Sequence, residues 1–240
     1  TTHENDGNIF GGGRGSDMFG SNQISPTAGH VRGNTNVTVT GGTMLHNIYG
    51  GGHLASVGDY TVDASGNVTA CAEGTGTATI LVTGGKIGID GNSNGRVFGA
   101  GRGVAGVDTY GNDYTKLTWV DSTSVTVNYT NTVDSTTVYP ADRSTTYDDF
   151  ATHLTNTKDA IPSDYEFIAG CVFGGGDNGH VLGNTNVTIS GGRIGTLTGN
   201  GVGNVFGGGR GVDTYGSGLM SETAGRVYGN TNVTVDGGWI

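Results

Sequence analysis

Three loops of this chain carry a carboxylate two residues before an aromatic ring. The pairs are Asp17 and Phe19, Asp108 and Tyr110, and Asp213 and Tyr215, and each loop begins with Arg-Gly directly after a glycine-rich run. If these loops are stacked, they present a row of carboxylates and rings, which suits sugars or a hard cation. The string Asp-X-aromatic-Gly also forms a good turn by itself. The six residues are therefore candidate ligand-binding residues, and the alternative is that they only form the turns of these loops.

Other chemistry-bearing residues give little support for catalysis or metal binding. The chain contains no His-Glu-X-X-His motif and no phosphate loop. Cys71 and Cys171 lack zinc-site spacing, and they either form one bridge or stay free. His30 and His180 share a repeat position with Arg226, so we expect both to be exposed. The sequence predicts no catalytic residue, no cofactor and no metal.

Two kinds of short strand must position the candidate loops. The first kind alternates Val or Ile with Thr, and three copies contain Gly-Asn-Thr-Asn-Val-Thr, starting at Gly33, Gly183 and Gly229. Alternation predicts that two apolar residues of each copy point to one face. These are Val37 and Val39, Ile80 and Val82, Val125 and Val127, Val187 and Ile189, and Val233 and Val235, at intervals of 43, 45, 62 and 46 residues.

The second kind is an aliphatic–aromatic pair that runs into a series of glycines. Its five copies start at Ile9-Phe10, Ile48-Tyr49, Val97-Phe98, Val172-Phe173 and Val205-Phe206. The two kinds alternate strictly along the chain. We expect the glycines to supply the positive φ angles at corners between faces.

This regular alternation predicts a repeat fold. One such strand cannot bury its apolar face alone, whereas stacked copies can bury the Val and Ile residues against their equivalents. The sequence therefore predicts an all-β chain, a right-handed parallel β-helix (β-solenoid) of about five coils, in one domain over 1–240. A β-sandwich and a β-propeller are the alternatives. Asn34, Asn184 and Asn230, with Asn36, Asn186 and Asn232, are expected to form amide ladders along the stack.

One segment breaks the pattern and lengthens the third interval to 62 residues. Residues 129–168 contain two of the three prolines and few glycines. Within them, Thr146–Lys158 has an acidic start, Phe150 and Leu154 four residues apart, and a terminal lysine, which predicts a short helix. We expect 129–168 to be an insertion into one coil.

Composition excludes several classes of protein and partner. The chain has 49 glycines in 240 residues but no Gly-X-Y period, so collagen is excluded, and the same glycines exclude a helical bundle. A net charge of −10 argues against nucleic acid and anionic membranes as partners. The sequence has no apolar run long enough for a membrane helix, so we expect no membrane insertion.

The alternating Val-Phe/Tyr-Gly-Gly-Gly and Asn-Thr-Asn-Val-Thr strands resemble the glycine-rich repeats of large bacterial surface proteins, the adhesin-like β-helix proteins. The resemblance covers nearly the whole chain except 129–168. It implies an extracellular location at the cell surface. It brings no catalytic motif to carry over.

The sequence therefore predicts a non-catalytic structural module, a subunit of a surface fibre or stalk. No polar cap is evident at either end, so Ile9 and Phe10 at one end and Trp239 and Ile240 at the other are the expected head-to-tail contacts. A piece of a longer array is the competing explanation. An adhesin that binds glycans or a host surface protein through its stacked loops is one alternative function, and a polysaccharide-degrading β-helix enzyme is another.

Overall fold

A computed structural model describes residues 7–15, 20–89, 94–129, 166–195, 203–211, 221–238 and 240. Its strands are β1 Ile9–Phe10, β2 Thr35–Met44, β3 Ile48–Tyr49, β4 Tyr60–Val62, β5 Val68–Cys71, β6 Thr77–Ile87, β7 Val97–Phe98, β8 Trp119–Val120, β9 Ser122–Asn128, β10 Phe167–Ile168, β11 Val172–Phe173, β12 His180–Val181, β13 Thr185–Gly191, β14 Arg193–Ile194, β15 Val205–Phe206 and β16 Thr231–Val235. A single turn of 3-10 helix, Tyr114–Lys116, lies between β7 and β8. The all-β prediction is confirmed for these residues.

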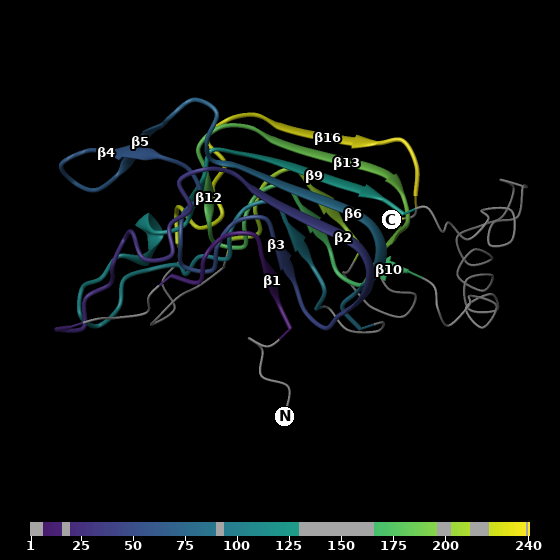
Figure 1. Cartoon of the computed structure of the whole chain (residues 1–240), viewed down its shortest axis with the longest axis horizontal. Coiled ribbons are helices and arrows are strands. Elements are labelled where there is room, and N and C mark those ends of the chain that lie inside the picture. The colour runs from purple at the N-terminus through teal and green to yellow at the C-terminus, as the bar shows by residue number, and fades with distance from the viewer. Residues whose placement is uncertain are drawn as a thin grey trace, which may run out of the picture.

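Parallel pairing dominates the fold. The five second-kind strands form one parallel sheet in the order β1-β3-β7-β11-β15. The five first-kind strands, β2, β6, β9, β13 and β16, form most of a seven-stranded parallel sheet, whose long strands curve around the core (Figure 1). We call one second-kind strand together with the following first-kind strand a repeat, so that repeat 1 holds β1 and β2 and repeat 5 holds β15 and β16.

The predicted register is confirmed. Val37 pairs with Ile80, Ile80 with Val125, Val125 with Val187, and Val187 with Val233. The intervals between repeated motifs are therefore the offsets between neighbouring strands. The second-kind strands pair in the same way, like residue on like residue, along their whole sheet.

The core lies between the two sheets. The inward aliphatic residues of repeats 1 to 4 are buried, with Val37 8% exposed and Ile80, Val125 and Val187 no more than 1%. Buried threonines tie the sheets together, because the hydroxyl of each donates to a glycine carbonyl in the following repeat. Thr35 reaches Gly50 at 2.7 Å, Thr123 reaches Gly174 at 2.6 Å, and Thr185 reaches Gly207 at 2.6 Å.

Two further rows of apolar residues complete the core, and the sequence reasoning did not predict them. Four repeats add a further apolar residue to the main cluster, after the Gly-Gly bend in repeats 1, 2 and 4 and at the end of the inserted segment in repeat 3. These residues are Met44, Ile87, Ile194 and Ile168. A second, smaller cluster gathers one valine from each of the five repeats. These are Val31, Val57, Val120, Val181 and Val227.

The glycines have two different structural roles. The second glycine of each Gly-Gly pair has a positive φ, as at Gly85 (φ 96°), which confirms the predicted corner there. The glycine runs after the second-kind strands do not, so the expectation of positive φ is wrong for them. A Cβ at Gly175 would lie 2.5 Å from the amide nitrogen of Gly209 in the next repeat. Those runs are glycine because neighbouring repeats approach too closely for a side chain.

The predicted insertion contributes both of its ends to the core. Tyr129 is 2% exposed, and Phe167–Ile168 form β10, which pairs with β6 and β14. The predicted helix at 146–158 falls in 130–165, outside the described residues. A separate antiparallel hairpin, β4–β5, projects from repeat 2 (Figure 1). Cys71 and Cys171 are both free thiols.

Candidate functional site

An unbroken stack of aromatic rings crosses the outer face of the five-stranded sheet. It runs Phe10–Tyr49–Phe98–Phe173–Phe206, with ring centroids 4.7, 5.0, 4.9 and 4.8 Å apart and ring planes within 12° of parallel. The three middle rings are at most 5% exposed. We call these five residues the aromatic row.

The local sequence explains why the rings face outward. Successive residues of a strand point to opposite faces, so the aliphatic residue of each pair enters the core and the following aromatic residue leaves it. Because the strands pair in register, every ring lies against its equivalent. Ring stacking adds to the stability that burial alone gives.

A row of mostly polar residues lies on one side of the aromatic row, one position before each second-kind strand. Its members are Asn8, Asn47, Arg96, Cys171 and Asn204. The carbonyl oxygen of the Asn47 side chain accepts hydrogen bonds from the amides of Gly95 and Arg96, at 3.2 and 2.8 Å. The side-chain amide of Asn47 donates to the Tyr49 hydroxyl at 3.2 Å. Asn47 therefore links repeats 2 and 3 and holds the Tyr49 ring in place.

A charged row lies on the other side, directly after the glycine runs. Its members are Arg14, His53, Arg102, Asp177 and Arg210. Arg102 donates to Nε2 of His53 at 3.1 Å, and Arg210 forms an ion pair with Asp177 at 3.0 Å. Asp177 is largely buried, whereas the side chain of Arg210 is 43% exposed.

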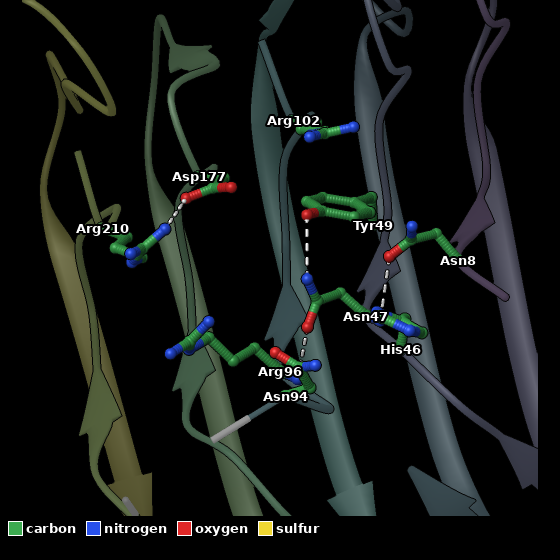
Figure 2. Close-up of a pocket in the computed structure, with 9 residues that line it drawn as sticks. All are labelled: Asn8, His46, Asn47, Tyr49, Asn94, Arg96, Arg102, Asp177 and Arg210. Carbon is green, nitrogen blue, oxygen red and sulfur yellow. Dashed lines mark hydrogen bonds and ion pairs between the residues drawn. The ribbon is translucent and has the colours of Figure 1, made fainter. Parts of the chain in front are cut away.

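A polar groove lies among these three rows, with a volume of about 260 Å³ (Figure 2). Its lining is Asn8, His46, Asn47, Tyr49, Asn94, Arg96, Arg102, Asp177 and Arg210. Three guanidinium groups and one carboxylate therefore face a common space. Burial, with a smaller contribution from the Asp177 carboxylate, raises the pKa of Tyr49 to about 12, so its hydroxyl stays protonated at neutral pH.

Of the six candidate ligand-binding residues, the structure describes Asp108 and Tyr110. One carboxylate oxygen of Asp108 accepts from the amides of Tyr110 and Asn112, both at 2.9 Å, and the other accepts from the Asn112 side chain at 2.8 Å. Tyr110 is 60% exposed. Asp108 thus has the contacts of a turn-closing residue. Asp17, Phe19, Asp213 and Tyr215 lie outside the described residues.

The same turn occurs elsewhere without an aromatic residue. In the β4–β5 hairpin, Asp63 accepts from the amides of Ser65 and Asn67, both at 2.9 Å. Both loops have the string Asp-X-X-Gly-Asn. Hydrogen bonds, chiefly from Asn112 and from Asn67 respectively, lower the pKa of Asp108 and of Asp63. The Asp-X-X-Gly-Asn string is therefore the better predictor of this loop.

The expectation that His180 is exposed is wrong. Its side chain is 2% exposed, packs 4.7 Å from the Trp119 ring and forms a 2.6 Å hydrogen bond with the carbonyl of Thr115. Burial lowers the pKa of His180, which favours the neutral ring. Position in the repeat was misleading, because Arg226 at the equivalent position of repeat 5 is exposed. The 3-10 turn that covers His180 belongs to a loop found in repeat 3.

The string Gly91-Asn92-Ser93-Asn94-Gly95 matches Gly-X-Ser-X-Gly, and the sequence reasoning missed it. That motif supplies a nucleophile where a strand turns directly into a helix. Here the string lies between β6 and β7, which are both strands. Ser93 itself lies outside the described residues, so the match gives no catalytic assignment.

Comparison of the chain with protein-family models, with curated proteins and with solved structures finds no match. Within the described ranges, no group of three or more His, Cys, Asp or Glu residues could hold a metal ion. No helix in that part of the chain is long and apolar enough to cross a membrane.

The pattern of the three rows was present in the sequence. Each repeat carries a polar or sulfur-containing residue, an aliphatic residue, an aromatic residue, a glycine-rich run and then a charged residue or histidine, as in Asn8-Ile9-Phe10-Gly11-Gly12-Gly13-Arg14. Alternation places the polar, the aromatic and the charged residue, such as Asn8, Phe10 and Arg14, on the outer side.

Proposed function

We propose that this chain is a non-catalytic β-solenoid, a structural module of a cell-surface fibre or stalk that stacks head-to-tail with further copies of itself. The parallel registers of both sheets support the solenoid, because each repeat adds one strand to each sheet. Right-handed coiling is the sense that parallel crossover connections nearly always adopt. The observation that carries the assembly is the likeness of the two outermost repeats.

The edge strands at the two ends of the stack have the same sequence. Residues 33–39 and 229–235 both read Gly-Asn-Thr-Asn-Val-Thr-Val, and residues 7–15 and 203–211 differ only in Ile9 against Val205. In the described residues, β2 pairs with β6 alone and β16 pairs with β13 alone. Placing β2 of one copy beside β16 of another would therefore put each side chain on its like, as β16 already does with β13.

Repeat 5 has the apolar, threonine and glycine positions by which interior repeats contact the next repeat, but no following repeat contacts them. Val233 and Val235 are 44% and 51% exposed, although their equivalents in repeat 4 are buried. The hydroxyl of Thr231 has no hydrogen-bond partner among the described residues, whereas the hydroxyl of Thr185 donates to the next repeat. A Cβ at Gly208 would meet no heavy atom of the described chain within 4 Å, whereas Gly175 is sterically restricted. An added repeat would use all of these positions.

The stacking would also continue the rows on the outer face. Phe206 is 43% exposed because it has a ring on one side only, and Phe10 of a second copy would extend the aromatic row. Ile9 and Phe10, predicted as end contacts, are half-buried on the first strand. Ile240 is 58% exposed, and Trp239 lies outside the described residues. A heterologous contact of this kind does not close on itself and yields open filaments.

Support for the surface location comes from the resemblance to glycine-rich surface repeats. A fibre needs length and edge complementarity but no catalytic centre. Recognition of glycans or a host surface protein by the Asp-X-aromatic loops stays a prediction.

Sedimentation velocity over a range of concentrations tests the assembly. We expect the wild-type chain to form larger species as concentration rises. V233D introduces a carboxylate at the proposed contact, so it should stay monomeric with a melting temperature within about 4 °C of the wild type. T61D, which alters an exposed residue of the β4–β5 hairpin, should assemble like the wild type. A wild type that is monomeric at every concentration, or a V233D variant that assembles normally, would contradict the proposal.

A further inference from the structure

The polar groove on the outer face concentrates positive charge in an acidic chain. Arg96, Arg102 and Arg210 line it, and Asp177 is the one carboxylate in its lining. The groove therefore carries a surplus of two positive charges, three minus one, in a chain whose net charge is −10. Figure 2 shows the guanidinium groups of Arg96 and Arg210 on the same side of the groove, with Asp177 bonded to Arg210.

The backbone pairing does not require arginine at these positions. The position of Arg96 holds Asn8, Asn47, Cys171 and Asn204 in the other repeats, and the position of Arg102 holds His53 in repeat 2. Arg102 and Arg210 have partners in His53 and Asp177, whereas no described carboxylate balances the charge of Arg96, so its repulsion with the other guanidinium groups raises the energy of the folded chain. A ligand that brings negative charge would relieve this repulsion.

We propose that the groove binds a small oxyanion-bearing ligand, and specifically the carboxylate of an acidic sugar. Guanidinium groups bind carboxylates through paired N–H donors, and Arg210 has donors beyond the one that it gives to Asp177. Arg96 has no ion-pair partner among the described residues, so its charge is available to the ligand. The carboxylate lies against Arg96 and Arg210.

Size and the neighbouring amides favour a sugar unit. At about 260 Å³ the groove is slightly smaller than the roughly 300–1,000 Å³ of sites for drug-sized ligands. The side-chain oxygen of Asn8 accepts from the Asn47 amide at 3.0 Å, which leaves its NH2 group to donate to a hydroxyl. Tyr49 is 1% exposed, so its ring supports the groove and does not stack on the sugar. Recognition is therefore polar and sensitive to salt.

This inference does not rest on head-to-tail assembly, so it can be tested on the V233D background as well as on the wild type. Isothermal titration calorimetry or chemical-shift titration at low salt would use D-glucuronate, inorganic sulfate and D-glucose as probes. We expect glucuronate to bind, glucose to show no saturation, and affinity for glucuronate to fall as salt rises.

Arg96→Gln keeps most of the side-chain stem that packs against Gly170 but removes the charge. It should weaken glucuronate binding at least tenfold at an unchanged melting temperature. The affinity of Arg96→Lys for glucuronate should lie between those of the wild type and Arg96→Gln, because lysine keeps the charge but lacks the planar guanidinium group. The matched control is Arg32→Gln, since the side chain of Arg32 is 82% exposed, lies 3.8 Å from Asp59 and is not part of the groove lining.

Three results would overturn the proposal or part of it. Failure of the wild type to bind either glucuronate or sulfate would exclude an oxyanion site. Equal weakening by Arg96→Gln and Arg32→Gln would show that binding follows overall charge and not the groove. Equal affinity for sulfate and glucuronate would support the oxyanion site and overturn its assignment to an acidic sugar.

Discussion

Repeats 4 and 5 have nearly the same strand sequences but very different surroundings. Val187 in β13 is 1% exposed, and its partner Val233 in β16 is 44% exposed. The same contrast holds for Phe173 and Phe206 in the aromatic row. Since propensity and pattern are shared, the difference comes from the following repeat, which repeat 4 has and repeat 5 lacks. In this fold, the free energy that a side chain contributes to folding depends on whether a following repeat covers it.

The largest effect is expected from a charge on the inward face. V187D should lower the free energy of unfolding by roughly 3–5 kcal/mol, because it buries a carboxylate among aliphatic side chains. V233D should cost less than about 1 kcal/mol, since that position is half open to water. Urea unfolding of the two variants checks this. Equal midpoints would mean that the two strands do not differ in burial.

The aromatic row gives the next contrast. Phe98 is fully buried between two rings, so F98A should cost about 3–5 kcal/mol. Phe206 contacts one ring of the row, and F206A should cost roughly 1 kcal/mol in the monomer. Thermal melts at low protein concentration, where assembly does not contribute, measure the difference. A costly F206A in the monomer would show that other residues bury this ring.

Backbone contact gives a smaller contrast. G175A should destabilise by about 1–3 kcal/mol, because its methyl group would meet the backbone of Gly209. G208A has no atom of the described chain nearby and should change stability by no more than about 0.5 kcal/mol. In the assembled state G208A should become disruptive, because a following repeat would occupy that space. If G208A leaves both stability and assembly unchanged, β15 is not a stacking edge.

The smallest effect concerns pH. Repeat 4 has buried His180 where repeat 5 has exposed Arg226. The folded chain lowers the pKa of His180, so below about pH 6.5 the unfolded chain takes up the proton first, and stability falls as pH drops. The depressed Asp63 and Asp108 pKa values act in the same direction but at more acidic pH. His180→Gln should remove the fall between pH 7.5 and 5. If the fall persists in that variant, another group is responsible.

The sequence predicted most of the architecture because its signals were local and repeated. The alternation in Val37-Thr38-Val39 and the spacing to Ile80 determined both the buried face and the strand partner. The burial of His180 could not be predicted in this way, because it depends on Trp119 and on the 3-10 turn at Tyr114–Lys116, which belong to one repeat only. The groove was missed because its residues come from several repeats and meet only once the strands are paired.

The central claim is that repeat 5 ends in an edge that accepts repeat 1 of another copy. Cryo-electron microscopy of the concentrated chain tests it most directly. Strands lie about 4.8 Å apart along a stack, so five repeats predict unbranched filaments with a subunit repeat of about 24 Å. β2 should lie parallel to β16 of the neighbouring copy, with Phe10 on Phe206. Isolated particles at every concentration, or two-fold dimers that join β16 to β16, would contradict the account.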